Sequence, residues 1–524
     1  MLTLPSVLQR TAQLFGSQPA IYHSEGHYTW AEFVDRVARA AGVLQRLGLQ
    51  PGERFGIIGR NSFRQAELMY AAYWMGTIPV PVNYRLAAPE IGSILDDAEC
   101  RLLVVADEFA PLIEDGALSA WHDRTLYLAA QTDDVVWPQY EGLMATTEPI
   151  PPRECAEDDD ALLLYTGATT GRAKGVRLSH RNIVSSGLQN IAAMQIRPDD
   201  IYLHVGPMFH SGDLRGTALT MAGGAHAFLP APSGQAVLEA IERYRATVVT
   251  MVPTIVMMTL QEPDFQTYDL SSLRLLQYGG SPMAVDWIRR AVAQYRGVEI
   301  QQVYGLTETS PVLTVLDGED HRQALEIGEY GVLKAAGRPL IGVDIRIVDD
   351  DGHQVEAGQP GEVTVRGPNV TGGYLNLPEE NQRAFQHGWF HTGDVGRVDA
   401  AGYLYVMGRK KEVVITGGEN VYTSEVEAVL HEHPKVHEAA VVGVPDERFG
   451  EALFAVIVPA PGSSITEEEV ISHCRGKIGG YKIPRRMAFV DEMPRSALGK
   501  VLKSEIQRIY GSTDDNPASD RGAP

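Results

Sequence analysis

Residues Tyr165–Val176 read Tyr-Thr-Gly-Ala-Thr-Thr-Gly-Arg-Ala-Lys-Gly-Val, and the rest of the chain is organised around this stretch. The apolar run Ala161–Leu164 predicts a strand before it, and a helix is expected to begin near Ser179. Between them, backbone N–H groups and threonine hydroxyls can surround the oxygens of a polyphosphate, and Lys174 adds a point charge. The spacing is not that of a Walker A loop, which contains Gly-Lys-Ser/Thr. Taken alone, the stretch is also compatible with an ordinary surface loop.

Length and composition indicate an acidic, enzyme-sized protein. A chain of 524 residues is too long for one compact core, so two or more domains are expected. A net charge of −22 argues against a nucleic-acid partner and against an anionic membrane surface. The three cysteines, Cys100, Cys155 and Cys474, form no metal-ligand spacing and indicate a reducing compartment. Because Met1–Ser17 lacks a signal-peptide layout and no apolar run has transmembrane length, we expect a cytoplasmic location.

Strands and helices alternate through the first 335 or so residues, which favours a mostly parallel sheet covered on both faces. The clearest expected helices are Trp30–Leu47, Arg64–Met75, Val237–Tyr244 and Trp287–Tyr295. The clearest expected strands are Phe55–Ile58, Ile78–Val82, Leu102–Val105, Ile201–Val205, Ala246–Val252, Leu273–Tyr278 and Val298–Val303. Two strands end in the small-residue turns Gly279–Pro282 and Tyr304–Glu308. Since ligands bind beyond the carboxyl ends of such strands, both turns are expected to face the loop at 166–175.

The composition changes after about residue 335. Val343–Val348 and Glu362–Arg366 alternate with the two-residue period of an antiparallel β-unit. A second α/β segment follows, in which Thr466 and Glu469 form a capping box at the start of a helix. We place the main domain boundary near 409–412, which predicts an N-terminal domain over 1–409 and a C-terminal domain over 410–510. The polar segment 511–524 is expected to be a disordered tail.

Several side chains outside the first stretch suggest nucleotide chemistry. The ring of Tyr304 offers a flat surface for a base, Thr307 is a hydroxyl donor, and Glu308 is a hard oxygen ligand suited to Mg²⁺. The alternative is a strand-to-loop turn with a core tyrosine. Asp394 can accept hydrogen bonds from two ribose hydroxyls, with Arg409 as a charge-assisted donor. The alternative for Asp394 is a β-turn before Gly396.

Three further features leave two interpretations open. Lys500, in the loop Arg495–Lys500, is either a solvated surface charge or a mobile donor that domain closure brings into a distant site. His210 either gates a pocket or is a packed side chain. The apolar stretch Met251–Leu260 either lines an acyl pocket or forms the core of a helix, and we favour the helix core.

Five short motifs stand in the order and at the spacing of the adenylate-forming superfamily of acyl-CoA synthetases, adenylation domains and firefly luciferases. The chain resembles this family from Tyr28 to Lys500, through Thr166–Lys174, Tyr304–Glu308, Thr392-Gly393-Asp394, Gly408-Arg409 and Gly499-Lys500. The resemblance implies an α/β fold: a large N-terminal domain of two α/β subdomains plus a small β-barrel, and a smaller, mobile α+β C-terminal domain. It also implies two half-reactions. A carboxylate attacks the α-phosphate of ATP to give acyl-AMP and pyrophosphate, and a thiol, usually of coenzyme A, then takes the acyl group and releases AMP.

The resemblance also implies a role for each matching position. The phosphate-binding loop would include Thr166, Thr169, Thr170 and Lys174. The adenine would lie near Gly279, Gly280 and Gln302, with its face against Tyr304. The α-phosphate would meet Thr307, Mg²⁺ would be held by Glu308, and the ribose would be bound by Asp394 and Arg409.

The remaining implied roles concern the acyl group and the C-terminal domain. Lys500 would bridge the carboxylate and the α-phosphate during adenylation, and Lys411 sits at the family's hinge position. The pantetheine tunnel would be lined by the loop Gly417-Gly418-Glu419-Asn420. His210 matches a position that often borders the acyl pocket.

The chain departs from the family pattern inside the phosphate-binding loop. Gly167-Ala168 replaces the usual Ser-Gly, which removes one hydroxyl and restricts the backbone at Ala168, and Ala173 replaces a usual proline. We expect a working loop that is slower or differently ordered. The leading hypothesis is an acid–CoA ligase for a neutral, apolar acid, fatty or aryl. The alternatives are a free-standing adenylation enzyme that loads a carrier protein, and a nucleotide-binding relative with little turnover.

The expected partners are therefore small molecules: a carboxylic acid, ATP with Mg²⁺, and CoA. Neither a nucleic acid nor a membrane span is expected, and a homodimer stays open. Amino-acid-activating relatives keep an aspartate near Pro207–Gly212 to hold the substrate amine. His210 occupies that region here, although Asp213 lies nearby.

Overall fold

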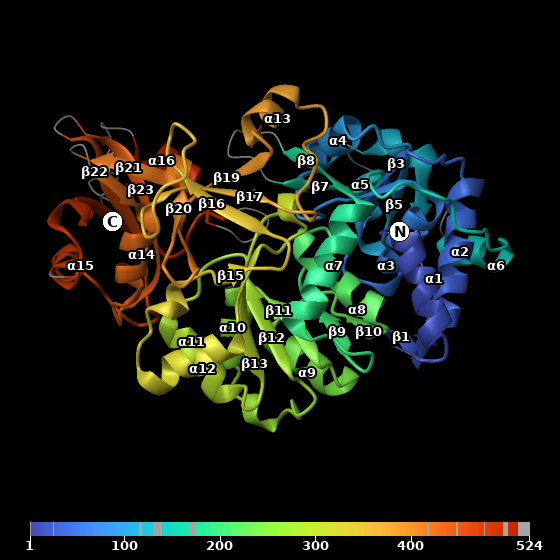
Figure 1. The fold of residues 1–524 in the computed structure, drawn as a ribbon, viewed down its shortest axis with the longest axis horizontal. Helices are drawn as coiled ribbons and strands as arrows, with labels where there is room; N and C mark the ends of the chain where they lie inside the picture. The colour runs from blue at the N-terminus through green and yellow to red at the C-terminus, as the bar shows by residue number, and fades with distance from the viewer. Residues whose placement is uncertain are drawn as a thin grey trace, which may run out of the picture. The chain divides into compact units, whose positions relative to one another are not determined.

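The computed structural model describes residues 2–24, 26–114, 118–128, 139–166, 173–416, 419–446, 449–475, 477–495 and 501–511 (Figure 1). The chain forms two compact units, and each is described by itself. The first comprises Met1–Arg346, Thr364–His391 and Gly402–Leu404. The second comprises Ile347–Val363, Thr392–Ala401 and Tyr405–Pro524.

The largest sheet among the described residues has nine strands, in the order β15-β14-β13-β12-β11-β9-β10-β1-β2. The strands from β13 to β1 run parallel, and antiparallel strands occupy both edges. In sheet order their bounds are Arg338–Pro339, Thr314–Leu316, Glu299–Tyr304, Leu275–Gly279, Val248–Met251, Ile201–His204, Ala225–Phe228, Pro19–His23 and Gly26–Thr29. Four of the expected strands, Ile201–Val205, Ala246–Val252, Leu273–Tyr278 and Val298–Val303, are confirmed within three residues at each end.

Helices cover this sheet on both faces. Neighbouring residues of a strand point to opposite faces, so two buried neighbours show what packs on each face. Leu276 packs with helices α9 (Gly234–Tyr244), α10 (Pro253–Leu260), α11 (Val285–Gln294) and α12 (Gly318–Ile327). Its neighbour Leu275 packs on the other face with α7 (His180–Met194) and α8 (Gly216–Ala222). Helix α10 buries Val256 and Leu260 in the core, as we favoured for this stretch, whereas Val252 and Met258 are exposed.

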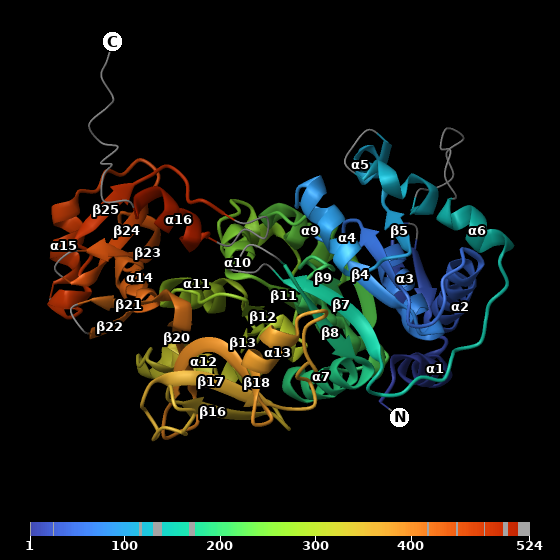
Figure 2. The same cartoon turned by 90° about the horizontal axis from the view of Figure 1, so that it is seen from above.

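A second sheet is fully parallel and has the order β4-β3-β5-β6. These strands are Ile78–Pro81, Arg54–Ile58, Leu102–Val105 and Thr125–Tyr127. Helices α2 (Trp30–Arg46) and α3 (Phe63–Met75) pack on one face, and α4 (Ala88–Asp97) packs on the other. Figure 2 shows α2 and α3 beside this sheet. A capping box between Thr29 and Glu32 begins α2, so the helix expected from the spacing of its apolar residues is confirmed.

The stretch Tyr165–Val176 joins two antiparallel strands, β7 (Asp160–Thr166) and β8 (Lys174–Ser179). The expected order of strand, loop and helix is therefore wrong in one respect, because β8 separates the loop from the helix. Burial explains the difference: Val176 and Leu178 are buried while Arg177 is exposed, which is the two-residue period of a strand. Helix α7 does begin after Ser179, whose hydroxyl accepts a hydrogen bond from Asn182 N at 3.2 Å.

The β-unit expected after residue 335 corresponds to a sheet of the described residues with the order β16-β17-β19-β18, in which β20 also pairs with β19. Its strands are Asp344–Val348, Gly361–Arg366, Trp389–Val398, Phe385–Gln386 and Leu404–Arg409, and helix α13 (Pro378–Ala384) precedes β18. The alternative that Asp394 lies in a β-turn is wrong, because this residue is inside the long strand β19.

The second unit has its own sheet, with the order β22-β21-β24-β23 and β25 on β24. The strands are Glu419–Tyr422, Val413–Thr416, Gly450–Pro459, Val436–Asp446 and Arg486–Phe489. Helices α14 (Thr423–His431) and α15 (Glu467–Cys474) pack on one face, and α16 (Lys503–Tyr510) packs on the other. The expected capping box at α15 is confirmed, because Glu469 N bonds to Thr466 Oγ1 at 3.3 Å and Thr466 N bonds to Glu469 Oε2 at 2.9 Å.

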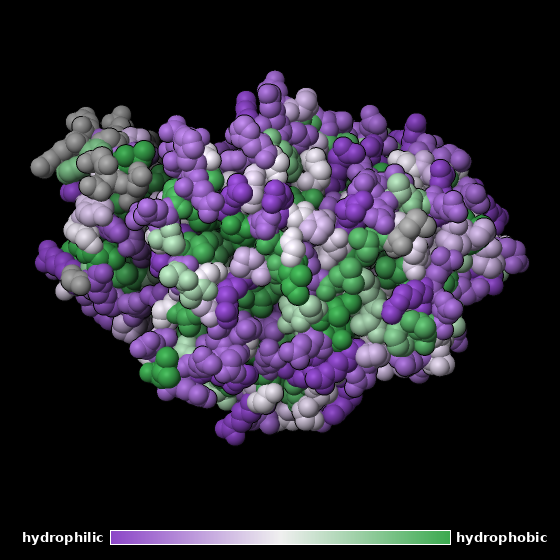
Figure 3. Space-filling model, in the orientation of Figure 1, coloured by the Kyte–Doolittle hydropathy of each residue, from purple (hydrophilic) through white to green (hydrophobic). Residues whose placement is uncertain are grey.

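The surface of the protein is largely hydrophilic, and its cysteines form no disulfide among the described residues. Hydrophilic side chains cover most of the face seen in Figure 3. No helix in the described ranges has both the length and the apolar character that crossing a membrane requires. Within the same ranges Cys100, Cys155 and Cys474 are free thiols.

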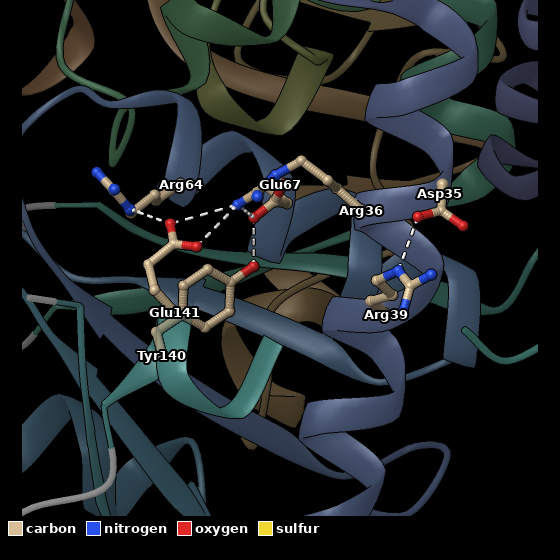
Figure 4. Close-up of polar contacts among 7 residues, drawn as sticks. All are labelled: Asp35, Arg36, Arg39, Arg64, Glu67, Tyr140 and Glu141. Atoms are coloured by element: carbon tan, nitrogen blue, oxygen red, sulfur yellow. Dashed lines mark hydrogen bonds and ion pairs between the residues drawn. The ribbon is translucent and has the colours of Figure 1, made fainter. Parts of the chain in front are cut away.

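A buried ion cluster joins α2, α3 and α6 (Tyr140–Thr146) in the first unit (Figure 4). Arg36 donates to Glu67 at 2.5 and 3.0 Å, and also to Glu141 at 3.3 Å. Arg64 donates to Glu141 at 2.6 Å, and the Tyr140 hydroxyl donates to the fully buried Glu67. Burial raises the pKa of Glu67, and Arg36 opposes that rise. The cluster links α3 to α6, although Glu67 and Tyr140 are 73 residues apart in sequence.

Candidate active site

Strand pairing positions the two described ends of the phosphate-binding loop. Thr166 and Lys174 face each other as the last pair of the β7–β8 hairpin. Residues 167–172, including Thr169 and Thr170, lie outside the described residues, so their implied roles stay predictions.

Lys174 and Glu308 come together through residues of a third segment. The Lys174 ammonium lies 2.5 Å from Glu380 Oε2, on α13, and 5.1 Å from the centre of the Tyr374 ring. The Tyr374 hydroxyl donates to Glu308 Oε1 at 2.9 Å. The predicted phosphate-binding lysine and the predicted Mg²⁺ ligand therefore lie in one continuous set of contacts.

The segment Tyr304–Glu308 leaves β13 and enters a short 3₁₀ helix, η5 (Thr307–Thr309). Gly305 is required there, because a Cβ on it would come within 2.0 Å of Pro311 O. Thr307 and Glu308 are both buried, with 8% and 9% of their surface exposed. Thr307 Oγ1 lies 3.2 Å from Ser211 Oγ, which brings the turn after His210 to the predicted α-phosphate site.

The predicted adenine-binding residues lie at the carboxyl ends of two neighbouring parallel strands. Gly279, the last residue of β12, pairs with Val303, so that Gly280 follows β12 and Tyr304 is the last residue of β13. Gly280 has φ +87°, a left-handed conformation that glycine adopts without strain. Gln302 accepts a hydrogen bond from the Tyr278 hydroxyl at 3.1 Å, which fixes the orientation of its side chain.

Asp394 and Arg409, the predicted ribose-binding residues, pair with each other in the second unit. Arg409 Nε lies 2.9 Å from Asp394 Oδ1, and its Nη1 donates to Thr392 O at 3.0 Å. Asp394 is buried, whereas the Arg409 side chain is 48% exposed. The pair fixes the direction of the carboxylate.

Three predicted residues of the C-terminal segment, Lys500, Gly417 and Gly418, lie outside the described residues. Lys411 is exposed in a 3₁₀ turn, η7 (Lys410–Glu412), just after β20. The structure therefore leaves their implied roles as predictions.

His210 precedes a 3₁₀ helix, η3 (Ser211–Arg215), and its Nδ1 accepts a hydrogen bond from Gly212 N at 3.5 Å. The same helix carries Asp213, which sequence reasoning noted only as a candidate for holding an amine. Its Oδ1 lies 2.5 Å from His204 Nδ1, so this carboxylate is already engaged by a histidine of β9.

A buried chain of polar groups, which no sequence motif predicts, continues from Asp213. His204 Nε2 lies 2.9 Å from His226 Nδ1, and His226 Nε2 lies 3.0 Å from Thr220 Oγ1. Thr220 Oγ1 lies 2.7 Å from the Tyr70 hydroxyl. Burial, together with His204, lowers the pKa of His226 well below its usual value. No spacing in the sequence predicts this series of hydrogen bonds, because its members come from four separate elements, β9, β10, α8 and α3.

Comparison with known proteins gives the family. A sequence model of the AMP-binding enzyme family matches residues 8–375, and one of the AMP-binding enzyme C-terminal domain matches residues 425–500. The chain is 37% identical over 504 residues to a feruloyl-CoA synthase of Amycolatopsis sp. The aligned region covers 96% of this chain and 98% of that relative. The chain is 35% identical over 512 residues to an indoleacetate–CoA ligase of Aromatoleum aromaticum, with 97% and 98% covered.

A solved structure agrees over the same length. The crystal structure of ATP-bound MatB from Rhodopseudomonas palustris matches with a TM-score of 0.85 at 32% identity, over 97% of this chain and 99% of that one. Both sequence models and the relatives span nearly the whole chain, so the resemblance drawn from five motifs is confirmed. The chain belongs to the AMP-binding enzyme family, within the adenylate-forming superfamily.

Proposed function

We propose that this protein is an AMP-forming acid–CoA ligase that acts on an aryl or fatty carboxylic acid. The observation that carries the proposal is the set of contacts joining Lys174, Tyr374 and Glu308 next to the strand ends at Gly280 and Tyr304. Family membership over the full length and the acid–CoA ligase activity of the two reported relatives support it.

The residues present suit an attack of a carboxylate on the α-phosphate of ATP. Such a reaction needs little covalent chemistry from the protein, but it needs charge neutralised on several oxygens at once. In this proposal Lys174 meets the outer phosphates, and Thr307 donates to the α-phosphate. The buried carboxylate of Glu308 is a hard oxygen donor of the kind Mg²⁺ prefers. Bound there, Mg²⁺ would supply positive charge to the phosphate oxygens.

For the C-terminal part we propose the mobile-domain scheme of the family. Residues 1–409 would form the adenylation domain and 410–510 a domain that moves about Lys411. In one position it would present Lys500 to the carboxylate and the α-phosphate. In the other, Gly417-Gly418-Glu419-Asn420 would line the path of CoA. A cytoplasmic location and a homodimer stay predictions.

Pyrophosphate release tests the function directly. The purified protein is incubated with ATP, Mg²⁺ and acids of graded length and aromaticity, with and without CoA, and acyl-CoA is identified by mass spectrometry. We expect pyrophosphate, AMP and acyl-CoA with CoA present. Acyl transfer to a carrier protein but not to CoA would support the carrier-loading alternative. ATP binding without pyrophosphate from any acid would support the relative with little turnover.

Replacing Asp394 by alanine is expected to lower kcat/KM for ATP by about 10- to 100-fold, since charge-assisted hydrogen bonds contribute about 1.5–3 kcal/mol. The loss should be much smaller with 2′,3′-dideoxy-ATP, which has no ribose hydroxyls to bind. Asp399→Asn, in an exposed turn where Asp399 Oδ1 accepts from Ala401 N at 3.0 Å, is the control. An equal loss with both nucleotides would show that Asp394 does not recognise the ribose.

A further inference from the structure

Tyr374, which belongs to none of the five motifs, connects Lys174 and Glu308. Its hydroxyl donates to Glu308 Oε1 at 2.9 Å, and its ring centre lies 5.1 Å from the Lys174 ammonium. The residue is buried, with 8% of its surface exposed. A single side chain thus touches the predicted metal ligand with its polar end and the predicted phosphate-binding lysine with its face.

The backbone around Tyr374 is held on the phosphate-loop hairpin. Leu375 N donates to Gly175 O at 2.8 Å, and Arg177 N donates to Gly373 O at 3.1 Å, so that the segment adds alongside β8. Asn381 bonds both backbone groups of Tyr374, accepting from its N at 2.7 Å and donating to its O at 2.9 Å. The ring position is therefore determined by the hairpin and by α13.

Glu308 is held from a second direction by the same segment, because Thr371 N donates to Glu308 O at 2.8 Å. The half-buried Lys174 and the buried Glu308 carry opposite charges, and opposite charges attract more strongly in a medium of low dielectric constant than in water. Here Lys174 instead pairs with Glu380 at 2.5 Å, and Glu308 is bonded by the Tyr374 phenol. Each of the two charged side chains therefore has a polar partner other than its opposite charge.

We propose that Tyr374 is a positioning residue of the nucleotide site, which holds the Glu308 carboxylate in the orientation that binds a divalent cation and keeps it apart from Lys174. This rests on the proposed role of Glu308 as the metal ligand. Without the phenol hydroxyl, one buried carboxylate oxygen loses its donor and the side chain can turn toward Lys174. Groups that orient a metal ligand typically change metal affinity by about 10- to 100-fold when removed.

The test measures binding of a metal to the full-length protein without any acid or CoA. Mn²⁺ binding to the protein–ATP complex is titrated by electron paramagnetic resonance, and metal-free ATP binding is measured by calorimetry. Tyr374→Phe is expected to raise the Kd for Mn²⁺ by about 10- to 100-fold. It should leave the Kd for metal-free ATP nearly unchanged, since Lys174 is still present.

Tyr403→Phe is the matched control. Tyr403 also donates to a carboxylate, Asp320 Oδ1, at 2.6 Å, and also has a cation over its ring, Arg338 at 4.6 Å. It should leave Mn²⁺ binding unchanged. A Glu308→Gln background supplies a double-mutant cycle, in which Tyr374→Phe should have no further effect on the metal.

The results distinguish a failure of the inference about Tyr374 from a failure of the proposed function. An unchanged Mn²⁺ Kd in Tyr374→Phe, an equal change in Tyr403→Phe, or an undiminished effect in the Glu308→Gln background would each overturn the inference. If the unaltered protein bound no Mn²⁺ with ATP, the proposed function itself would fail instead. Thermal unfolding without nucleotide checks that Tyr374→Phe folds, and removal of a single oxygen makes that the expected result.

A separate observation concerns Arg215, the last residue of η3. Its side chain is buried, with 7% of the residue exposed, and its Nη1 donates to Gly212 O at 3.0 Å. Its Nε has no hydrogen-bond partner among the described residues. The carboxylate two residues before it, Asp213, pairs with His204 at 2.5 Å. Burial lowers the pKa of Arg215, which reflects the cost of a desolvated cation.

The surroundings of Arg215 connect it to the candidate site. Its Nη1 lies 3.6 Å from the place where a Cβ on Gly212 would stand, and His210 Nδ1 lies 3.9 Å from the same place. Ser211, one residue earlier, lies 3.2 Å from Thr307. A buried donor left unpaired is costly, so native structures retain one where a ligand or a water completes it.

We infer that Arg215 receives a hydrogen-bond-accepting oxygen of the acid, such as a ring hydroxyl or carbonyl, and so favours oxygenated aryl acids over plain ones. This rests on the proposed ligase function. The test compares kcat/KM for pairs of aryl acids that differ only in a ring oxygen, in the unaltered protein and in Arg215→Met, which keeps an unbranched side chain but removes the guanidinium. We expect the oxygenated acid to be preferred by about 10- to 100-fold and the preference to disappear in Arg215→Met.

Arg215→Lys keeps the charge and is expected to retain part of the preference. A preference that survives Arg215→Met, or no preference in the unaltered protein, would overturn the inference. Acyl-CoA formation from the plain acids by the same variants shows that the ligase function stands when this inference fails. Calorimetric binding of the acids without ATP gives a readout that is independent of turnover.

Discussion

Replacing Lys500 by alanine is expected to lower the rate of acyl-AMP formation by about 10²–10³-fold, the cost of deleting one preorganised donor at a developing charge. The resemblance places this lysine between the carboxylate and the α-phosphate in the adenylation step. Thioester formation from supplied acyl-AMP should proceed at nearly the native rate, because that step needs no charge neutralised at the attacking carboxylate. Pyrophosphate release measures the first half-reaction, and acyl-CoA formed from synthetic acyl-AMP measures the second.

Lys477→Ala is the control for this experiment. The Lys477 ammonium pairs with Glu432 at 3.0 Å on the surface of the second unit, and both side chains are more than 40% exposed. Its loss should leave both half-reactions unchanged, since exposed ion pairs contribute little. An equal loss of both half-reactions in Lys500→Ala would contradict the role assigned to Lys500 and would indicate a general structural defect.

Replacing Arg36 by methionine is expected to destabilise the first unit by about 3–5 kcal/mol, because it leaves the buried carboxylate of Glu67 without its cation. Arg36 bonds this carboxylate at 2.5 and 3.0 Å, and Glu67 is completely buried (Figure 4). Urea denaturation measures the loss, and amide hydrogen exchange over α2 and α3 locates it. Arg36→Met combined with Glu67→Gln should recover part of the stability, since no buried charge then stands unpaired.

The same helix offers a control in Arg39, which pairs with Asp35 at 2.7 Å in an exposed position (Figure 4). Arg39→Met should cost about 1 kcal/mol or less. A similar loss in Arg39→Met and Arg36→Met would contradict the distinction between the buried and the exposed pair.

The loss in Arg36→Met should also depend on pH. Burial raises the pKa of Glu67, and without Arg36 nothing in that pair opposes the rise. A carboxyl whose folded-state pKa lies above its unfolded value contributes stability at low pH, and that contribution disappears as the pH rises through the folded-state pKa. The deficit relative to the unaltered protein is therefore expected to be larger at about pH 8 than at about pH 5.

Local patterns predicted most of the fold. Strand β5 has the expected bounds, Leu102–Val105, and α2 begins at Trp30 behind its capping box. These elements depend on the spacing of apolar residues and on caps within a few positions, so neighbouring residues are sufficient to specify them. Strand β8 is not predicted although its alternation is visible, because its first residue, Lys174, and the glycines before it suggest a loop that leads straight into a helix.

The candidate site also contains residues that short motifs predict and residues that only the structure reveals. Lys174, Thr307 and Glu308 were singled out from short motifs, and the structure brings the lysine and the glutamate into one set of contacts. Tyr374 was not predicted, because its partner Glu308 lies 66 residues away and no local signal accompanies such a pair. The engagement of Asp213 by His204 was likewise invisible, since it depends on how η3 packs on β9.

By itself, the sequence determined the family, the order of the helices and strands, and the residue types that a nucleotide reaction needs, because each of these depends on short stretches of chain. Only the tertiary structure decided which polar and charged groups pair: Lys174 with Glu380, Glu308 with Tyr374, and Asp213 with His204. The physical reason is that electrostatic interactions and hydrogen bonds act over a few ångströms in space, whatever the separation along the chain.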